Sequence, residues 1–184
     1  MAAIIEIFGA TIIAGIMILS VINQSGTLNR ATAEQTLSVN LEKNEVTLAR
    51  ILESDFMKIG YRVPPPAILA ADSTSITFLS DYSNTGTTKT VKFYLGNVLD
   101  APAAISSNPR DKLIYREVTG SPVWSDNAGL TRLNLTYFDS TGSQTADVNL
   151  IRSIKIKFTL ESPQAYDAKY LSASWQKTVY LKNF

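Results

Sequence analysis

An almost unbroken apolar run, from Ile4 to Ile22, lies near the start of the chain. It contains one acid, Glu6, and no Lys, Arg or Pro. As an α-helix it would rise about 28 Å, close to the thickness of the hydrocarbon core of a bilayer. An ionised carboxylate in that core costs on the order of 2–3 kcal/mol near the centre and less toward the ends. The pattern predicts a membrane-spanning segment over residues 1–25. Its acid either pairs during assembly or lies at the interface, favoured by the positive end of the helix dipole.

Apolar positions with helical spacing continue over residues 26–60. The stripe comprises Leu37, Leu41, Leu48, Leu52, Phe56 and Ile59. Such spacing is typical of an amphipathic helix that packs on a soluble domain. Gly60 and the three prolines that begin at Pro64 are helix-stop signals. We predict one helix over residues 3–59, bent or softened near Gly26.

Beyond the prolines the apolar positions alternate with a period of two. The predicted strands are Ser75–Asp81, Thr90–Gly96, Lys112–Val118, Leu130–Phe138, Val148–Leu160 and Leu171–Leu181. Segments rich in Asp, Asn, Ser and Gly separate them and favour hairpin turns. Residues 61–184 are therefore expected to form a mostly antiparallel sheet. Its apolar face would rest on the helix stripe and its lysine-bearing face would meet water. The predicted fold class is α+β.

The composition narrows the chemistry that the chain can perform. It has 17 basic and 16 acidic residues, a formal net charge of +1, and neither Cys nor His. This balance gives no support for nucleic-acid binding. Disulfides, thiolate or imidazole metal ligands and a Ser-His-Asp triad are excluded. We find no phosphate loop and no paired catalytic carboxylates, so we expect no enzymatic activity and no cofactor.

Three short segments carry several oxygen-bearing side chains before a glycine: Asp81–Gly86, Asp126–Gly129 and Asp139–Gly142. The first contains Ser83 and Asn84 and faintly resembles a calcium loop, but it lacks the later bidentate acid that such loops use. The other two are weaker matches. We interpret all three as ordinary β-turns, because Asp, Asn and Gly are the residues that turns favour.

Three further features are better explained by structure than by function. Trp124 and Trp175 have no obvious basic or stacking neighbours in the sequence, so packing in the core or at a sheet edge is expected. Asn134 begins an Asn-Leu-Thr glycosylation pattern. It falls within a predicted strand, which favours a chance match.

Several segments together resemble a known family. AAIIEIFGATIIAGIMILSVI, read from Ala2, places Glu6 at the fifth position of an apolar helix. LARILESDFMKIGYRVP, SITFLSDYSNTGTTKTVKFYLG, GLTRLNLTYFDSTG, IRSIKIKFTLES and SWQKTVYLKNF then follow in order. Over nearly its whole length the chain resembles the type IV pilin and type II secretion pseudopilin superfamily. It is most similar to the larger minor pilins and minor pseudopilins.

The resemblance implies a structural subunit of a pilus-like or pseudopilus filament. It would be stored in the bacterial inner membrane, with a periplasmic head, and assembled through its apolar helix. The implied partners are membrane lipid before assembly, an inner-membrane assembly platform, and other copies or related subunits. In the family the acid corresponding to Glu6 pairs with the free amino terminus of a neighbouring subunit.

The start of the chain departs from the family pattern. Family precursors carry a leader that ends in Gly and is cut before a residue that is usually Phe and becomes N-methylated. Here Met1 directly precedes Ala2. Either the sequence begins near the mature end or processing differs, so Met1 and Ala2 are the candidate processing site, and Glu6 and Ala2 the assembly residues.

A second interpretation keeps the helix only as an anchor. The chain would then be a membrane-tethered module whose head binds a periplasmic or extracellular ligand and is not built into a filament. The apolar pattern passes from the membrane segment into the amphipathic helix without a flexible linker, which favours the filament subunit.

Overall fold

The computed structural model describes residues 2–100 and 106–184 of the chain. The chain divides into two compact units, an N-terminal unit, Met1–Val39, and a C-terminal unit, Asn40–Phe184. The predicted boundaries at residues 25 and 60 stay a prediction. The two units are described separately below.

One helix, α1 (Ala2–Phe56), dominates the first third of the sequence. This confirms the predicted long helix, and the backbone stays helical through Gly26. The helix ends three residues earlier than predicted, and residues 57–62 form turns. Gly60 has a φ of 73°, and a Cβ there would meet the Ala67 Cβ and the Asn183 carbonyl oxygen at 3.2 Å. The predicted stop signal is therefore a position that needs glycine.

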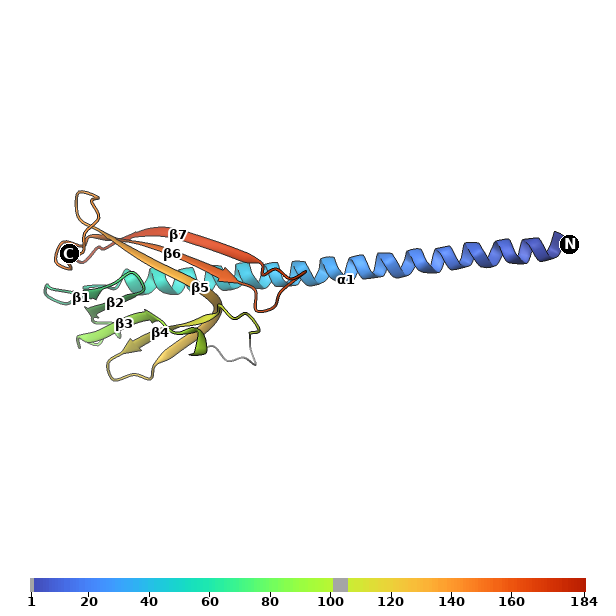
Figure 1. Cartoon of the computed structure of the whole chain (residues 1–184). Coiled ribbons are helices and arrows are strands. Elements are labelled where there is room, and N and C mark those ends of the chain that lie inside the picture. The colour runs from blue at the N-terminus through green and yellow to red at the C-terminus, as the bar shows by residue number, and fades with distance from the viewer. Residues whose placement is uncertain (1, 101–105) are drawn as a thin grey trace. The chain divides into compact units, whose positions relative to one another are not determined.

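The C-terminal unit contains one antiparallel sheet whose seven strands follow the order of the sequence. The strands are β1 (Ile68–Ala71), β2 (Ser75–Ser80), β3 (Lys89–Leu95), β4 (Lys112–Val118), β5 (Trp124–Phe138), β6 (Ser153–Glu161) and β7 (Ser172–Tyr180). A short 3₁₀ turn, η1 (Val98–Asp100), follows β3. The predicted α+β class with a long helix on an antiparallel sheet is confirmed (Figure 1).

The core of the C-terminal unit forms between one face of this sheet and the stripe of α1. Leu48, Leu52 and Phe56 are at most 1% exposed and belong to one cluster with inward-facing strand residues. The ring of Phe56 meets those of Phe78 and Phe93 edge-on, with centroids 6.5 and 5.6 Å away. Aromatic pairs prefer this geometry, and burial of such side chains stabilises a fold by roughly 1.5–3 kcal/mol each.

The structure corrects several predicted element boundaries. β1 was not predicted, because the alanines in Ile68–Ala71 have low strand propensity; the strand forms through its pairing with β2. β5 begins at Trp124, so the predicted turn Asp126–Gly129 lies inside a strand and that prediction was wrong. The register shifts between Leu130 and Arg132, and Gly129 has a φ of 81°, so a glycine-assisted bulge gives a turn-like composition to a continuous strand.

β6 begins at Ser153, five residues later than predicted. Before it the backbone forms a turn in which the Leu150 amide donates to the Asp147 carbonyl and the Asn149 amide donates to the Asp147 carboxylate. Local side chain to backbone bonds of this kind compete with strand pairing, and a period-two apolar pattern does not reveal them.

Candidate functional site

Glu6 lies on α1 in the N-terminal unit, and its side chain is exposed. Within the described part of the chain, no ion pair and no side-chain hydrogen bond includes it. Met1 lies outside the described residues, and Ala2 begins α1. The structure therefore places Glu6 where a second molecule can reach it. The predicted processing position falls at the edge of the described chain.

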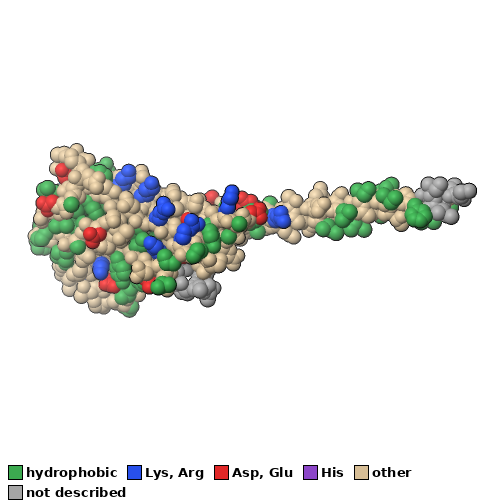
Figure 2. All heavy atoms as spheres, viewed as in Figure 1, with side chains coloured by type: hydrophobic (Ala, Val, Ile, Leu, Met, Phe, Trp, Pro, Cys, Tyr) green, Lys and Arg blue, Asp and Glu red, His purple; other side chains and the backbone are tan. Residues whose placement is uncertain are grey.

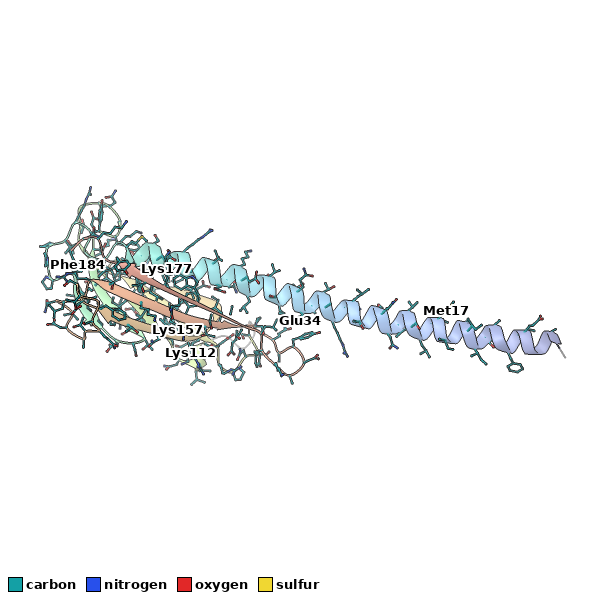
Figure 3. The ribbon with its side chains drawn as sticks, turned by 90° about the horizontal axis from the view of Figure 1, so that it is seen from above. Met17, Glu34, Lys112, Lys157, Lys177 and Phe184 are labelled. Carbon is teal, nitrogen blue, oxygen red and sulfur yellow. The ribbon has the colours of Figure 1, made fainter. Side chains whose placement is uncertain are left out.

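The large apolar side chains from Ile7 to Ile22 are all exposed, by 57% to 65%. An 18-residue window within this helix reaches a mean hydropathy of 1.9 and is not buried at all, so the helix is long and apolar enough to cross a membrane. Met17 marks this exposed part of α1 in Figure 3. The hydroxyl of Thr11 donates to the carbonyl oxygens of Ile7 and Phe8 at 3.0 and 2.9 Å. Its polar group is thus satisfied inside the helix, as a lipid or protein interior requires.

A buried carboxylate, Asp55, ties α1 to the sheet within the C-terminal unit. Asp55 is 3% exposed. One carboxylate oxygen accepts from Nη1 of Arg116 on β4 at 2.8 Å, and the other accepts from the hydroxyl of Tyr82 at 3.0 Å. The Lys58 ammonium is 3.5 Å away. A charge-assisted pair of this length fixes the last turn of the helix against one strand.

Aromatic rings surround the cation of this network. The Arg116 guanidinium carbon lies 5.5 Å from the centre of the Tyr82 ring and 5.0 Å from that of Trp124. Burial and the nearby Asp55 carboxylate raise the pKa of Tyr82 to about 12, so its hydroxyl stays a donor at neutral pH. We did not predict this cluster. The sequence feature that could have predicted it is Asp55, which lies three residues after Leu52 on the apolar stripe. A charged side chain at a buried position needs a partner.

Residues near the C-terminus contact the backbone just after the end of α1. The Asn183 side-chain amide donates to the carbonyl oxygens of Met57 and Ile59 at 3.2 and 2.9 Å. Carbonyls after the last turn of a helix lack partners inside the helix, and this amide satisfies two of them. The end of the chain is therefore part of the structure that holds the helix end.

The two remaining calcium-like segments are turns that use their own oxygens. The Asp81 carboxylate accepts from the amides of Thr85 and Gly86, both at 2.9 Å. Burial opposes its ionisation, but these amides and Arg62 outweigh that effect and lower the pKa of Asp81. Asp139 accepts from the amides of Thr141 and Ser143. The turn interpretation is confirmed for both, and the described residues contain no cluster of three or more possible metal-ligating side chains.

The predicted packing roles of the two tryptophans are confirmed. Trp175 on β7 stacks on Phe158 of β6, with ring centroids 5.1 Å apart. Trp124 packs against the core and also faces Arg116, a basic neighbour that sequence proximity did not reveal. Asn134 is exposed within β5, as expected from its place in a strand.

Asp111 is the least satisfied charged group among the described residues. It is 1% exposed, and neither carboxylate oxygen has a hydrogen-bond partner there. Burial raises the pKa of Asp111, and the nearby Glu161 carboxylate adds to this effect. A carboxyl whose pKa is raised by folding stabilises the fold fully below its ordinary pKa of 3.8 and loses that contribution as the pH rises through the folded value.

We therefore expect Asp111→Asn to stabilise the protein at pH 7, by on the order of 1 kcal/mol, because a neutral amide is less costly to bury than a carboxylate. The gain should shrink as the pH falls through the raised pKa of Asp111 toward its ordinary value of 3.8, below which both side chains are neutral. Urea unfolding of the full chain in detergent, followed by tryptophan fluorescence at pH 7 and at a pH below 3.8, measures this difference. Asp167→Asn, at an exposed position, serves as the control and should change little. Equal gains at both pH values would contradict the expectation.

Comparison with known proteins adds no relative, since no family model, curated protein or solved structure matches the chain.

Proposed function

We propose that this protein is a structural subunit of a type IV pilus-like or pseudopilus filament, assembled through the N-terminal part of α1. The observation that supports this most strongly is the exposed apolar surface from Ile7 to Ile22 with a single acid, Glu6, near its start. Nothing within the described residues covers that surface. It needs either lipid or other helices around it.

The proposed subunit uses both surroundings in turn. In the inner membrane, lipid covers the apolar side chains. In a filament, the same side chains pack among the helices of other copies or related subunits, delivered by an inner-membrane assembly platform. A carboxylate inside such a bundle needs a cation. The first basic residue in the sequence is Arg30, well beyond the apolar segment, so the resemblance to pilins assigns this role to the free amino group of a neighbouring subunit.

The polar residues after the apolar run also favour a filament subunit over a tethered module. Residues 23–39 are helical rather than coiled, although Gly26 lies among them. A flexible tether would need a Gly- and Ser-rich coil at this point. The exposed polar side chains of Thr27, Thr32 and Thr36 each donate to a carbonyl four residues earlier. The segment therefore supports a helix that continues beyond the membrane.

Shearing cells that express the protein tests the proposal. We expect the chain to leave the cells with the sheared material and to sediment as filaments visible by electron microscopy. An inner-membrane protein with one helix and no filament role serves as the control and should stay with the cells. A chain found only in the membrane fraction, under conditions in which the cells make filaments, would contradict the proposal and favour the tethered module.

A further inference from the structure

The face of the sheet that points away from α1 carries three cations on neighbouring strands. Arg132 on β5 and Lys155 and Lys157 on β6 alternate with the buried residues of these strands. We call these three residues the cationic face. Figure 2 shows Lys and Arg side chains in a row on this side of the sheet. By contrast, Lys177 lies beside α1 and bonds Glu53 at 2.6 Å (Figure 3).

Hydroxyl and amide groups surround the cationic face. Lys157 pairs with Asn134 on β5 and with Gln176 on β7, and Lys155 pairs with Thr136 and Thr178. A groove of 560 Å³ runs over part of this face, with Arg132 and Lys157 in its lining. Glu161, in the same lining, is already bonded to Arg110 at 2.8 Å. The face is therefore polar and positively charged.

The members of the cationic face repel one another. None of them belongs to an ion pair among the described residues. Residues two apart on a strand are about 7 Å apart, and two unit charges at that distance in water repel by about 0.6 kcal/mol. An anionic partner would remove this repulsion. The sheet itself separates these cations from the acids of their own α1, whereas the same acids on a second molecule can reach them.

A matching pair of acids lies on the part of α1 inside the C-terminal unit. Glu42 is exposed and Glu45 is half-buried. Residues three apart on a helix are neighbours, with about 5–6 Å between their Cβ atoms. Neither acid has a basic residue three or four positions away, and neither belongs to an ion pair among the described residues. Their separation is within about 2 Å of that between Lys155 and Lys157, a difference that long lysine side chains absorb.

We propose that the cationic face of one copy docks on Glu42 and Glu45 of a second copy. The contact places two like-charged pairs opposite each other and relieves both repulsions. It would form an interface between the C-terminal units of neighbouring subunits, so this proposal rests on the proposed filament function. The cationic face lies on β5 and β6 and the two acids lie on α1, so the two halves of the contact are different surfaces of the same molecule. This arrangement suits head-to-tail repetition along an assembly.

Disulfide cross-linking tests the contact directly, because the chain has no cysteine of its own. We expect the double variant Lys157→Cys with Glu45→Cys to form dimers and a ladder of higher species on non-reducing gels, in membranes and in sheared filaments. Lys157→Cys with Lys43→Cys is the matched control, since Lys43 points about 160° away from Glu45 around the helix. Cross-linking at 157 and 45 that does not exceed this control would overturn the proposal.

A charge swap provides a second measurement. Lys155→Glu with Lys157→Glu should lower cross-linking between other cysteine pairs of the interface, such as Arg132→Cys with Glu42→Cys, by at least tenfold. Adding Glu45→Lys should restore much of it. Raising the salt concentration should weaken the wild-type contact, because surface charges are screened. No change with either charge reversal or salt would count against the contact.

These results separate the contact from the filament function. Filaments without the 157–45 cross-link would overturn the contact and leave the proposed function standing. A cross-link in membranes without filaments would support the contact and count against the function. Binding of the full chain in detergent micelles to phosphatidylglycerol vesicles that is lost on charge reversal, with no cross-link between copies, would assign the cationic face to anionic lipid and overturn the proposal.

Discussion

Glu6→Ala is expected to lower incorporation into filaments at least tenfold while the protein remains in the membrane. In the bilayer the substitution removes the cost of a buried carboxylate, on the order of 2–3 kcal/mol at the centre and less near the end of the segment. In the proposed filament it would remove the partner of the neighbouring subunit's amino group. Both changes shift the equilibrium between membrane-held and filament-incorporated protein toward the membrane. A free-energy change of about 1.4 kcal/mol already changes that equilibrium constant tenfold. Quantifying the chain in sheared filaments and in membranes measures the effect.

Two further variants define the reason for the loss. Glu6→Gln keeps the shape of the side chain and removes its charge, so it should be incorporated into filaments as poorly as Glu6→Ala. Glu6→Asp keeps the charge and should be incorporated in part. Ser20→Ala, within the same exposed apolar segment, is the control and should incorporate normally. If Glu6→Ala enters filaments as well as the wild type does, the acid has no role in assembly and lies at the interface only.

Asp55→Ala is expected to lower the free energy of unfolding of the C-terminal unit by about 2–3 kcal/mol. Removing one partner of a buried ion pair costs about 3–5 kcal/mol because the other charge is left unpaired. Here the Arg116 side chain keeps 24% of its exposure and its two aromatic neighbours, which reduces the loss. Urea unfolding of the full chain in detergent, followed by tryptophan fluorescence, reports on this unit because Trp124 and Trp175 both lie in it.

A double-mutant comparison shows whether the unpaired charge causes the loss. Asp55→Ala with Arg116→Met should be more stable than Asp55→Ala alone, since the second change removes the orphaned cation and keeps apolar packing. Lys43→Ala, an exposed position on the same helix, should change the stability by less than about 0.5 kcal/mol. A loss in Asp55→Ala that the second substitution does not reduce would assign the effect to helix packing rather than to the ion pair.

The long helix could be predicted because each of its signals is local. The apolar run, the stripe from Leu37 to Ile59 and the stop at Gly60 depend only on residues close together in the sequence. The six predicted strands were identified in the same way, from alternation alone. β1 was not predicted, because its pairing with β2 outweighs its weak strand propensity. Asp126–Gly129 was wrongly predicted as a turn, because a bulge in β5 has the composition of a turn.

The order of apolar and polar residues by itself determined the helix, the alternating strands and a membrane-sized segment with one acid. These properties follow from backbone periodicity, which needs no distant contact. Only the tertiary structure brought Asp55 to Arg116, Asn183 to the end of α1 and Arg132 beside Lys157. Such pairs join residues far apart in the sequence. Their geometry depends on strand register and helix docking, which packing of the whole C-terminal unit decides.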